Sequence, residues 1–209
     1  MYVLPQKKLE TKEEFEQWYE KEDPWKIRER KNIVNRIGSI WRIISPHKNK
    51  KVLIDCGCGE GVITSFISKQ FELSVGIDIS RKALLRAKEK VENCDFIVGD
   101  IRLLPFGERC ADCITCFETL YYLKTDYEKA LQEFARVLKS GGWSIVSIQL
   151  GKNYFNYDTF MGSFQKYFKK PKIFVLEPKL RFFFERVNVF PNAPILANKI
   201  IIASSSDPS

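Results

Sequence analysis

The sequence of 209 residues predicts an α/β fold, in which a doubly wound and mostly parallel sheet carries helices on both faces. Short apolar runs typical of buried strands alternate with segments of helical period through the middle of the chain. A glycine-rich turn joins the first strand to the first of these helices, and the next two strands each end in an aspartate. Such features gather at one edge of a parallel sheet, where ligands bind.

Two helices are expected before the sheet. The first begins at the capping-box sequence Thr11-Lys-Glu-Glu14 and ends near Pro24, because proline disfavours helix at the residue before it. Its apolar stripe consists of Phe15, Trp18 and Tyr19. The second helix runs from about Lys26 to Ile44, with one apolar face. Its first turns carry the basic residues Arg28, Arg30 and Lys31.

The stretch 51–61 organises the chain. Val52-Leu53-Ile54 reads as a buried strand, Asp55 closes it, and Gly57-x-Gly59-x-Gly61 follows directly. Glycines allow a tight backbone bend and let a ligand lie against the main chain, because no Cβ intervenes. No lysine follows the glycines, which excludes a P-loop site for a nucleoside triphosphate. The glycine spacing is also shorter than that of a dinucleotide-binding Rossmann turn.

The later strands place more polar groups at the same edge. The second strand ends in Asp78, where a carboxylate can accept hydrogen bonds from both hydroxyls of a ribose, and the third ends in Asp100, which can accept from an exocyclic amine. The fourth strand ends near Phe117. Asp126 is expected to cap the next helix, which the glycine pair 141–142 ends before a fifth strand at 143–148.

The tail has a different pattern. Residues 156–168 read as a helix, and 172–176, 182–190 and 199–203 read as strands joined by proline-rich turns. We therefore expect an N-terminal helical lid over residues 1–45, a cofactor-binding core over 46–150, and C-terminal strands and substrate-side elements over 151–209, all within one domain.

Composition limits the function classes. The chain is 44% hydrophobic, contains no run that could span a membrane and begins without the features of a signal peptide, so we expect a cytoplasmic protein. The net charge of +8 comes from the two flanks, which suggests an acidic or polyanionic partner or simply solvated lysines. Cys110, Cys113 and Cys116 fall on a strand, where residues three apart face opposite sides, so no metal site is expected.

Several segments together resemble the class I S-adenosylmethionine-dependent methyltransferases. They are Asp55-Cys-Gly-Cys-Gly-Glu-Gly61, Gly76-Ile-Asp-Ile-Ser80, Val98-Gly-Asp100, Leu104-Pro-Phe106 and Leu138-Lys-Ser-Gly-Gly142. The resemblance implies a Rossmann-like sheet of seven strands with an antiparallel C-terminal edge, and S-adenosyl-L-methionine as the cofactor. The residues that it implies for the core of the cofactor site are Asp55, Gly57, Cys58, Gly59, Gly61, Asp78, Ile79, Asp100, Ile101 and Phe117.

The N-terminal part adds a narrower resemblance. Trp18-Tyr-Glu-Lys-Glu-Asp-Pro-Trp25, and Glu118-Thr-Leu-Tyr-Tyr-Leu123 after the fourth strand, are similar to the nodulation-protein-S-like N-methyltransferases. This resemblance implies that the N-terminal helices cover the cofactor. Arg28 or Arg30 would then pair with the cofactor carboxylate, since a guanidinium forms two parallel bonds to it, and Trp25 is either a lid residue or a packing residue.

The predicted reaction is in-line methyl transfer to an N or O atom of a small molecule, which can be an acidic one. Glu118 or Tyr122 is the candidate for accepting a proton from the acceptor. One alternative is an RNA or protein methyltransferase that uses the basic and aromatic tail. Another is a regulator that binds S-adenosylmethionine without catalysis. Methyl acceptors that are nucleic acids are the less favoured alternative, and no membrane partner is expected.

Overall fold

The computed structural model describes residues 10–29, 33–48, 50–151, 154–175 and 199–205. Their seven-stranded sheet has the order β3-β2-β1-β4-β5-β7-β6. The strands are β1 (Val52–Cys56), β2 (Leu73–Asp78), β3 (Asp95–Val98), β4 (Ala111–Phe117), β5 (Leu138–Gln149), β6 (Lys169–Val175) and β7 (Lys199–Ser205). Strands β1 to β5 pair in parallel, whereas β7 runs antiparallel to β5 and β6. The predicted mostly parallel sheet with an antiparallel edge is confirmed.

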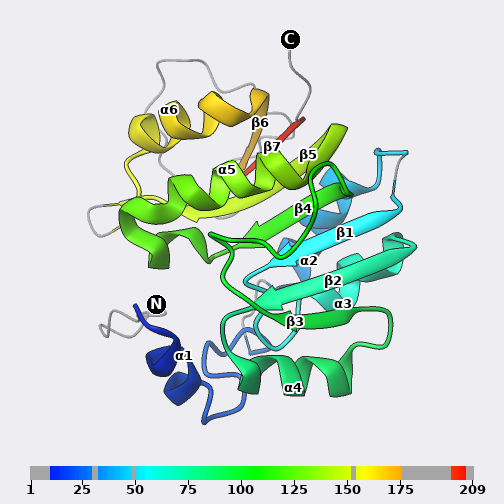
Figure 1. Cartoon of the computed structure of the whole chain (residues 1–209), viewed down its shortest axis with the longest axis vertical. Coiled ribbons are helices and arrows are strands. Elements are labelled where there is room, and N and C mark those ends of the chain that lie inside the picture. Colours follow the sequence, from blue (N-terminus) through cyan, green and yellow to red (C-terminus); the bar gives the residue numbers. More distant parts are fainter. Residues whose placement is uncertain (1–9, 30–32, 49, 152–153, 176–198, 206–209) are drawn as a thin grey trace.

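Helices surround this sheet (Figure 1). They are α1 (Lys12–Trp18), α2 (Ile33–Ile44), α3 (Thr64–Ile67), α4 (Arg81–Lys90), α5 (Tyr127–Val137) and α6 (Tyr157–Tyr167), with the 3-10 segments η1 (Ser68–Gln70) and η2 (Leu120–Asp126). The predicted caps of α1 and α4 form as expected: the Thr11 hydroxyl accepts from the Glu14 amide, and the Ser80 hydroxyl accepts from the Ala83 amide.

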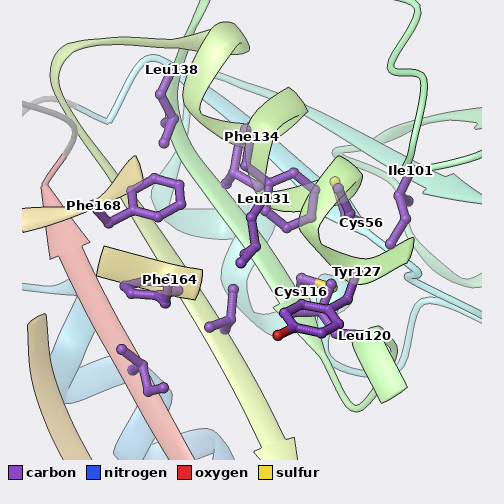
Figure 2. Close-up of a cluster of buried hydrophobic side chains, with 14 of the residues drawn as sticks. Cys56, Ile101, Cys116, Leu120, Tyr127, Leu131, Phe134, Leu138, Phe164 and Phe168 are labelled. Atoms are coloured by element: carbon purple, nitrogen blue, oxygen red, sulfur yellow. The ribbon is translucent and has the colours of Figure 1, made fainter. Parts of the chain in front are cut away.

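Two apolar clusters cover the two faces of the sheet. The larger one joins α5 and α6 to the sheet, and Figure 2 shows Phe134, Phe164 and Phe168 within it. The smaller one brings Ile40 and Ile44 of α2 and Ile67 of α3 against the other face. Cys116 belongs to the first cluster and Cys113 to the second, so these two thiols of the cysteine-rich strand lie on opposite sides of the sheet.

The predicted second helix begins too early. Helix α2 starts at Ile33, whereas residues 26–29 are not helical: 26 and 27 have no regular structure, 28 and 29 form a turn, and Lys26 has a φ of +48°. The carboxylate of Asp23 accepts hydrogen bonds from the amides of Ile27 and Arg28, at 2.8 and 3.0 Å. Because an aspartate side chain can replace a helical carbonyl as the acceptor, these amides are held outside any helix.

The glycine pair 141–142 also behaves differently from the prediction. Helix α5 ends at Val137, before the glycines, and strand β5 already begins at Leu138. The pairing of β4 with β5 shifts register across residues 139–142, and Gly141 has a φ of +73°. The glycines therefore form an irregularity within the strand rather than a helix end. Asp126 precedes α5, but its side chain accepts no capping hydrogen bond there.

The other elements of the tail agree with the sequence where the structure describes them. Helix α6 and strands β6 and β7 match three of the predicted segments, while the strand expected at 182–190 lies outside the described residues. None of the helices in the described ranges combines the length and apolar character needed to cross a membrane. The same ranges contain no group of three His, Cys, Asp or Glu residues that could hold a metal ion.

Candidate active site

A cavity of about 300 Å³ lies at the carboxyl ends of the strands, within the size range of small-molecule sites. The turn after β1 and the residues after β2, β3 and β4 form its floor, and residues 10–27 form its roof. The predicted residues that line it are Trp25, Gly57, Cys58, Gly59, Asp78, Ile79, Asp100, Ile101, Phe117, Glu118 and Tyr122.

The glycine turn forms the centre of the floor. Gly57, Gly59 and Gly61 have φ values of +72°, +55° and +72°, a region that side chains rarely adopt. A Cβ at Gly57 would lie 2.3 Å from the Thr119 hydroxyl oxygen, so this position also lacks room for one. Gly61 is different: it faces α4 rather than the cavity, and a Cβ there would meet Val91 at 2.9 Å.

Asp55 lies beneath the turn and does not line the cavity. Its two carboxylate oxygens accept hydrogen bonds from the Thr64 and Thr115 hydroxyls, each at 2.6 Å. Burial raises its pKa, and these two hydrogen bonds act in the opposite direction. Asp55 therefore joins the turn to α3 and β4, and the structure brings it under the predicted cofactor site rather than into it.

Asp78 presents its carboxylate at the cavity edge. One oxygen accepts from the Gly59 amide at 2.8 Å, and the other accepts from the Ser80 amide at 2.9 Å. A carboxylate oxygen can accept two hydrogen bonds, so each oxygen can accept one more from a ligand. Burial raises the pKa of Asp78 to about 6, although the two amides favour its ionised form.

Asp100 is held by a neighbour that the sequence analysis did not single out. The Arg102 guanidinium donates to both of its carboxylate oxygens and also to Asp126 at 3.1 Å. Burial would raise the pKa of Asp100, but the hydrogen bonds and charge of Arg102 outweigh burial and lower it. The predicted adenine-binding carboxylate is thus at the cavity, in an ion pair that fixes its orientation.

The roof is aromatic. The Trp25 indole N–H donates to the Tyr19 hydroxyl at 2.8 Å, and the Trp25 and Tyr122 ring centroids are 5.7 Å apart. Phe15 meets Tyr122 edge-on at 5.3 Å. Burial, with the nearby Asp78 charge, raises the pKa of Tyr19 well above its ordinary value. Trp25 therefore both packs and lines the cavity, because it joins the N-terminal segment to the residues after β4.

Ion pairs fasten the roof to the floor. Glu60, within the glycine turn, has a side chain only 4% exposed and pairs with Arg86 of α4 at 2.9 Å and with Arg28 of the roof segment at 3.6 Å. It also accepts from the Asp23 amide at 3.0 Å. Across the roof, Glu16 accepts from the first amides of α4, where the helix dipole favours a negative charge.

Arg28 therefore has a different place from the predicted one. It does not line the cavity, since its guanidinium is paired with Glu60 and, at 2.9 Å, with Glu22. The alternative candidate, Arg30, lies outside the described residues. The arginine instead holds the roof segment against the glycine turn.

The residues after β4 form the far wall of the cavity. Glu118 has a φ of +56°, a conformation that costs about 1–3 kcal/mol for a residue with a Cβ and is often found at functional sites. Its amide donates to the Ser147 hydroxyl oxygen at 2.9 Å, and that hydroxyl donates to its carboxylate at 3.0 Å. Tyr121 and Tyr122 follow, with ring centroids 4.4 Å apart.

Some cavity residues were not predicted as site residues. Phe15 and Tyr19 were recognised only as an apolar stripe, although an aromatic stripe beside a proline-terminated helix was a signal for them. Thr119 and Arg102 gave no signal, because their roles depend on contacts across the sheet edge.

Comparisons with known proteins agree with this geometry. A family model described as a methyltransferase domain matches residues 54–146. An uncharacterized protein of Methanocaldococcus jannaschii is 31% identical over 66% of this chain and 60% of its own length. The ubiquinone biosynthesis O-methyltransferase of Nitrosomonas europaea is 34% identical over 47% of this chain and 44% of its own length. The matches thus span less than two thirds of these relatives.

A solved structure extends the agreement to the whole fold. The N-methyltransferase NodS from Bradyrhizobium japonicum, in complex with S-adenosyl-L-homocysteine, aligns with a TM-score of 0.73 at 16% identity. The alignment covers 96% of this chain and 100% of that one, including the N-terminal and C-terminal elements outside the family model. Residues 54–146 of the chain are therefore similar to a methyltransferase domain, and the described elements as a whole share the fold of this methyltransferase structure.

Proposed function

We propose that this protein transfers a methyl group from S-adenosyl-L-methionine to an N or O atom of a small molecule. The observation that carries the proposal is the carboxylate of Asp78 at the cavity edge, beside the glycine turn. Each of its oxygens receives one backbone amide and keeps acceptor capacity for one hydroxyl, which suits the two hydroxyls of a ribose. The relatives named as an O-methyltransferase and an N-methyltransferase support the same reaction class.

The residues present fit this cofactor. The cavity wall at Gly57 and Gly59 lacks side chains, which leaves room for the methionine part against the backbone. Ile79 and Ile101 provide apolar surface for the adenine, and Asp100 provides an acceptor at its edge. When bound, the sulfonium of the cofactor supplies an electrophilic methyl group.

The chain would then act mainly by positioning. Holding two reactants in line removes much of the entropic cost of their encounter. The roof formed by Phe15, Tyr19 and Trp25 would keep water from the cavity. An amine or hydroxyl acceptor must lose a proton to become nucleophilic or to complete the transfer. Glu118, whose carboxylate lies on the far wall, is the group we assign to accept it.

The small size of the cavity, about 300 Å³, favours a small acceptor over a macromolecular one. The basic strand β6 of the tail is the sheet edge remote from β1, β2 and β3, beside which the cavity lies, and Lys166 of α6 pairs with Glu128. The other basic residues of the tail that suggested nucleic-acid binding, Lys179, Arg181 and Arg186, lie outside the described residues. Among the described residues of the tail, no lysine lines the cavity.

Calorimetry with S-adenosylhomocysteine tests the cofactor assignment. The substitution Asp78→Asn removes the charge that two ribose hydroxyls would contact, and we expect the affinity to fall at least about 100-fold, as for the loss of charged hydrogen bonds. Asp95→Asn, at an exposed position on β3, is the matched control and should leave the affinity within about twofold. Unchanged affinity in the Asp78 variant would contradict the proposal.

A methyl-transfer screen with amine and alcohol acceptors separates an enzyme from a regulator. A protein that binds S-adenosylmethionine tightly and transfers its methyl group to none of these acceptors would instead favour the non-catalytic alternative.

A further inference from the structure

The far wall of the cavity combines one carboxylate with several aromatic rings. Glu118 and Tyr121 both line the cavity, and the charge of Glu118 contributes to the raised pKa of Tyr121. Tyr154 packs edge-on against Tyr121 at 5.4 Å, and the same charge contributes to the raised pKa of Tyr154. The ring of Tyr122 is tilted by 46° against that of Tyr121, and their hydroxyl oxygens are 3.5 Å apart. We define Glu118, Tyr121 and Tyr122, which all line the cavity, as the acceptor corner; Tyr154 packs against Tyr121 but does not line the cavity.

The cavity wall around this corner carries an excess of negative charge. Its carboxylates are Glu10, Asp78, Asp100, Glu118 and Asp126, and its cations are Arg102 and Lys124. Arg102 is paired with Asp100 and Asp126, and Lys124 is paired with Glu10 at 2.5 Å. Each of these two lining cations is therefore offset by a carboxylate, and the described lining residues carry more carboxylates than cations. An anionic acceptor would meet repulsion here, although the net charge of the whole chain is positive.

Tyrosine rings and a carboxylate together select a cation. The face of an aromatic ring attracts an ammonium ion, most strongly where water is excluded, and a nearby carboxylate adds a direct charge interaction. The Glu118 carboxylate is already oriented by the Ser147 hydroxyl at 3.0 Å, and its backbone conformation is strained. A residue with a strained backbone that holds a carboxylate beside two cavity-lining tyrosines, at the end of strand β4, is typical of a recognition site.

We propose that the methyl acceptor is an amine that binds as an ammonium ion in the acceptor corner, between the Glu118 carboxylate and the rings of Tyr121 and Tyr122. This inference rests on the proposed methyltransferase function and narrows its acceptor to a cationic one. The ammonium group loses its proton to Glu118 before the nitrogen lone pair forms the new N–C bond. The S–C bond breaks as this bond forms, and its electron pair stays on sulfur.

A pair of isosteric probes measures the charge preference directly. Choline and 3,3-dimethylbutan-1-ol have the same shape and differ in whether the central atom is a charged nitrogen or a neutral carbon. Binding of each probe is followed by nuclear magnetic resonance in the presence of saturating S-adenosylhomocysteine, so that the sulfonium charge is absent. We expect the wild-type protein to bind choline at least about tenfold more tightly than the neutral probe.

Substitutions test whether the acceptor corner causes the preference for choline over the neutral probe. Glu118→Gln should bring the affinity for choline to within about threefold of the affinity for the neutral probe, since the carboxylate is lost while the size of the side chain is retained. We call the quotient of these two affinities the ratio. Tyr121→Leu should reduce it several-fold, and Tyr121→Phe should retain it, because the ring rather than the hydroxyl contacts the cation. Glu108→Gln, outside the cavity lining, is the matched control and should leave the ratio unchanged. S-adenosylhomocysteine affinity and the unfolding midpoint verify that each variant is folded.

Three results would overturn the inference while the cofactor assignment still holds. They are equal affinity for the two probes, no binding of choline at millimolar concentration, and an unchanged ratio in Glu118→Gln. If Glu118→Gln instead weakens S-adenosylmethionine relative to S-adenosylhomocysteine without changing the probe ratio, the corner serves the sulfonium and the inference is also wrong. Failure of the wild-type protein to bind S-adenosylhomocysteine would contradict the proposed function itself.

Discussion

The floor and the roof of the cavity are built by different physical means. The floor consists of backbone turns and strand ends, held by the positive φ angles of the glycines and by amide hydrogen bonds to Asp78. The roof consists of aromatic side chains on residues 10–27, held to the floor largely by ion pairs through Glu60 and hydrogen bonds to Glu16. The difference indicates that the roof can lose its attachment while the sheet stays folded.

The strongest test of the floor is Gly57→Ala. The new Cβ would lie 2.3 Å from the Thr119 hydroxyl oxygen and 2.8 Å from its Cβ, at a φ of +72°. We expect the free energy of unfolding to fall by about 2–4 kcal/mol, from strain and overpacking together, with loss of cofactor affinity. Urea unfolding and calorimetry measure both effects.

Gly162→Ala is the matched control for this substitution. Nothing lies within 4 Å of a Cβ at Gly162, which is in helix α6, so alanine should raise the stability by up to about 1 kcal/mol. Equal stability of the two variants would remove the argument that the turn needs glycine.

The roof is tested by Glu60→Gln. The amide keeps the size of the side chain but removes the charge that faces Arg86 at 2.9 Å and Arg28 at 3.6 Å. The two arginine side chains are 25% and 39% exposed, so solvent screens part of the interaction. We expect the substitution to lower the free energy of unfolding by about 1–3 kcal/mol. Protease cleavage within residues 10–29 should become faster at the same time.

Glu22→Gln provides the comparison for the roof. Glu22 pairs with Arg28 and Lys90 but is 60% exposed, and solvent screens such a carboxylate, so its neutralisation should cost much less than that of Glu60. If Glu60→Gln and Glu22→Gln change the stability and the rate of protease cleavage equally, the burial of Glu60 does not determine how the roof is attached.

The smallest predicted effect is the pH dependence of cofactor binding. The pKa of Asp78 is about 6 in the folded chain, above its ordinary value of 3.8, so the folded protein favours the protonated form. The stability from this group is present below pH 3.8 and is lost as the pH rises through about 6. Cofactor binding has the opposite sign, because ribose hydroxyls donate to the ionised carboxylate.

We therefore expect the affinity for S-adenosylhomocysteine to fall about tenfold from pH 7 to pH 5. Calorimetry across this interval measures the effect, and Asp78→Asn should bind weakly with little further change. A decrease of the same size in the Asn variant would assign the titration to another group.

The same contrast explains how much the sequence could predict. The floor follows from local features: a buried strand before Asp55, the glycine spacing, and the strands that end at Asp78 and Asp100. Each of these sequence patterns spans only a few residues, and the parallel topology brings the residues after β1, β2 and β3 to the same edge of the sheet. Strand β5 was predicted less well, because the register shift at Gly141 depends on its pairing with β4.

The roof depends on contacts that a local pattern cannot contain. Arg28 carries the charge expected of a cofactor ligand, but its partner is decided by Glu60, which lies 32 residues later in the sequence. The helix expected from Lys26 fails for a similar reason, since the Asp23 side chain takes the amides of the first turn. The apolar residues after Lys26 do have helical spacing, but the hydrogen bonds of the amides to the Asp23 carboxylate outweigh this preference.

The attachment of Glu16 has a kinetic consequence. Its carboxylate accepts from the Arg81 and Lys82 amides and from the Ser80 hydroxyl, two residues after the proposed ribose ligand Asp78. A bound nucleoside would leave only when this attachment and the ion pairs of Glu60 open together, so release would be slower than for an open cleft. Because salt screens charges beyond about 8–10 Å and weakens exposed pairs, the proposed cofactor would leave faster at higher ionic strength.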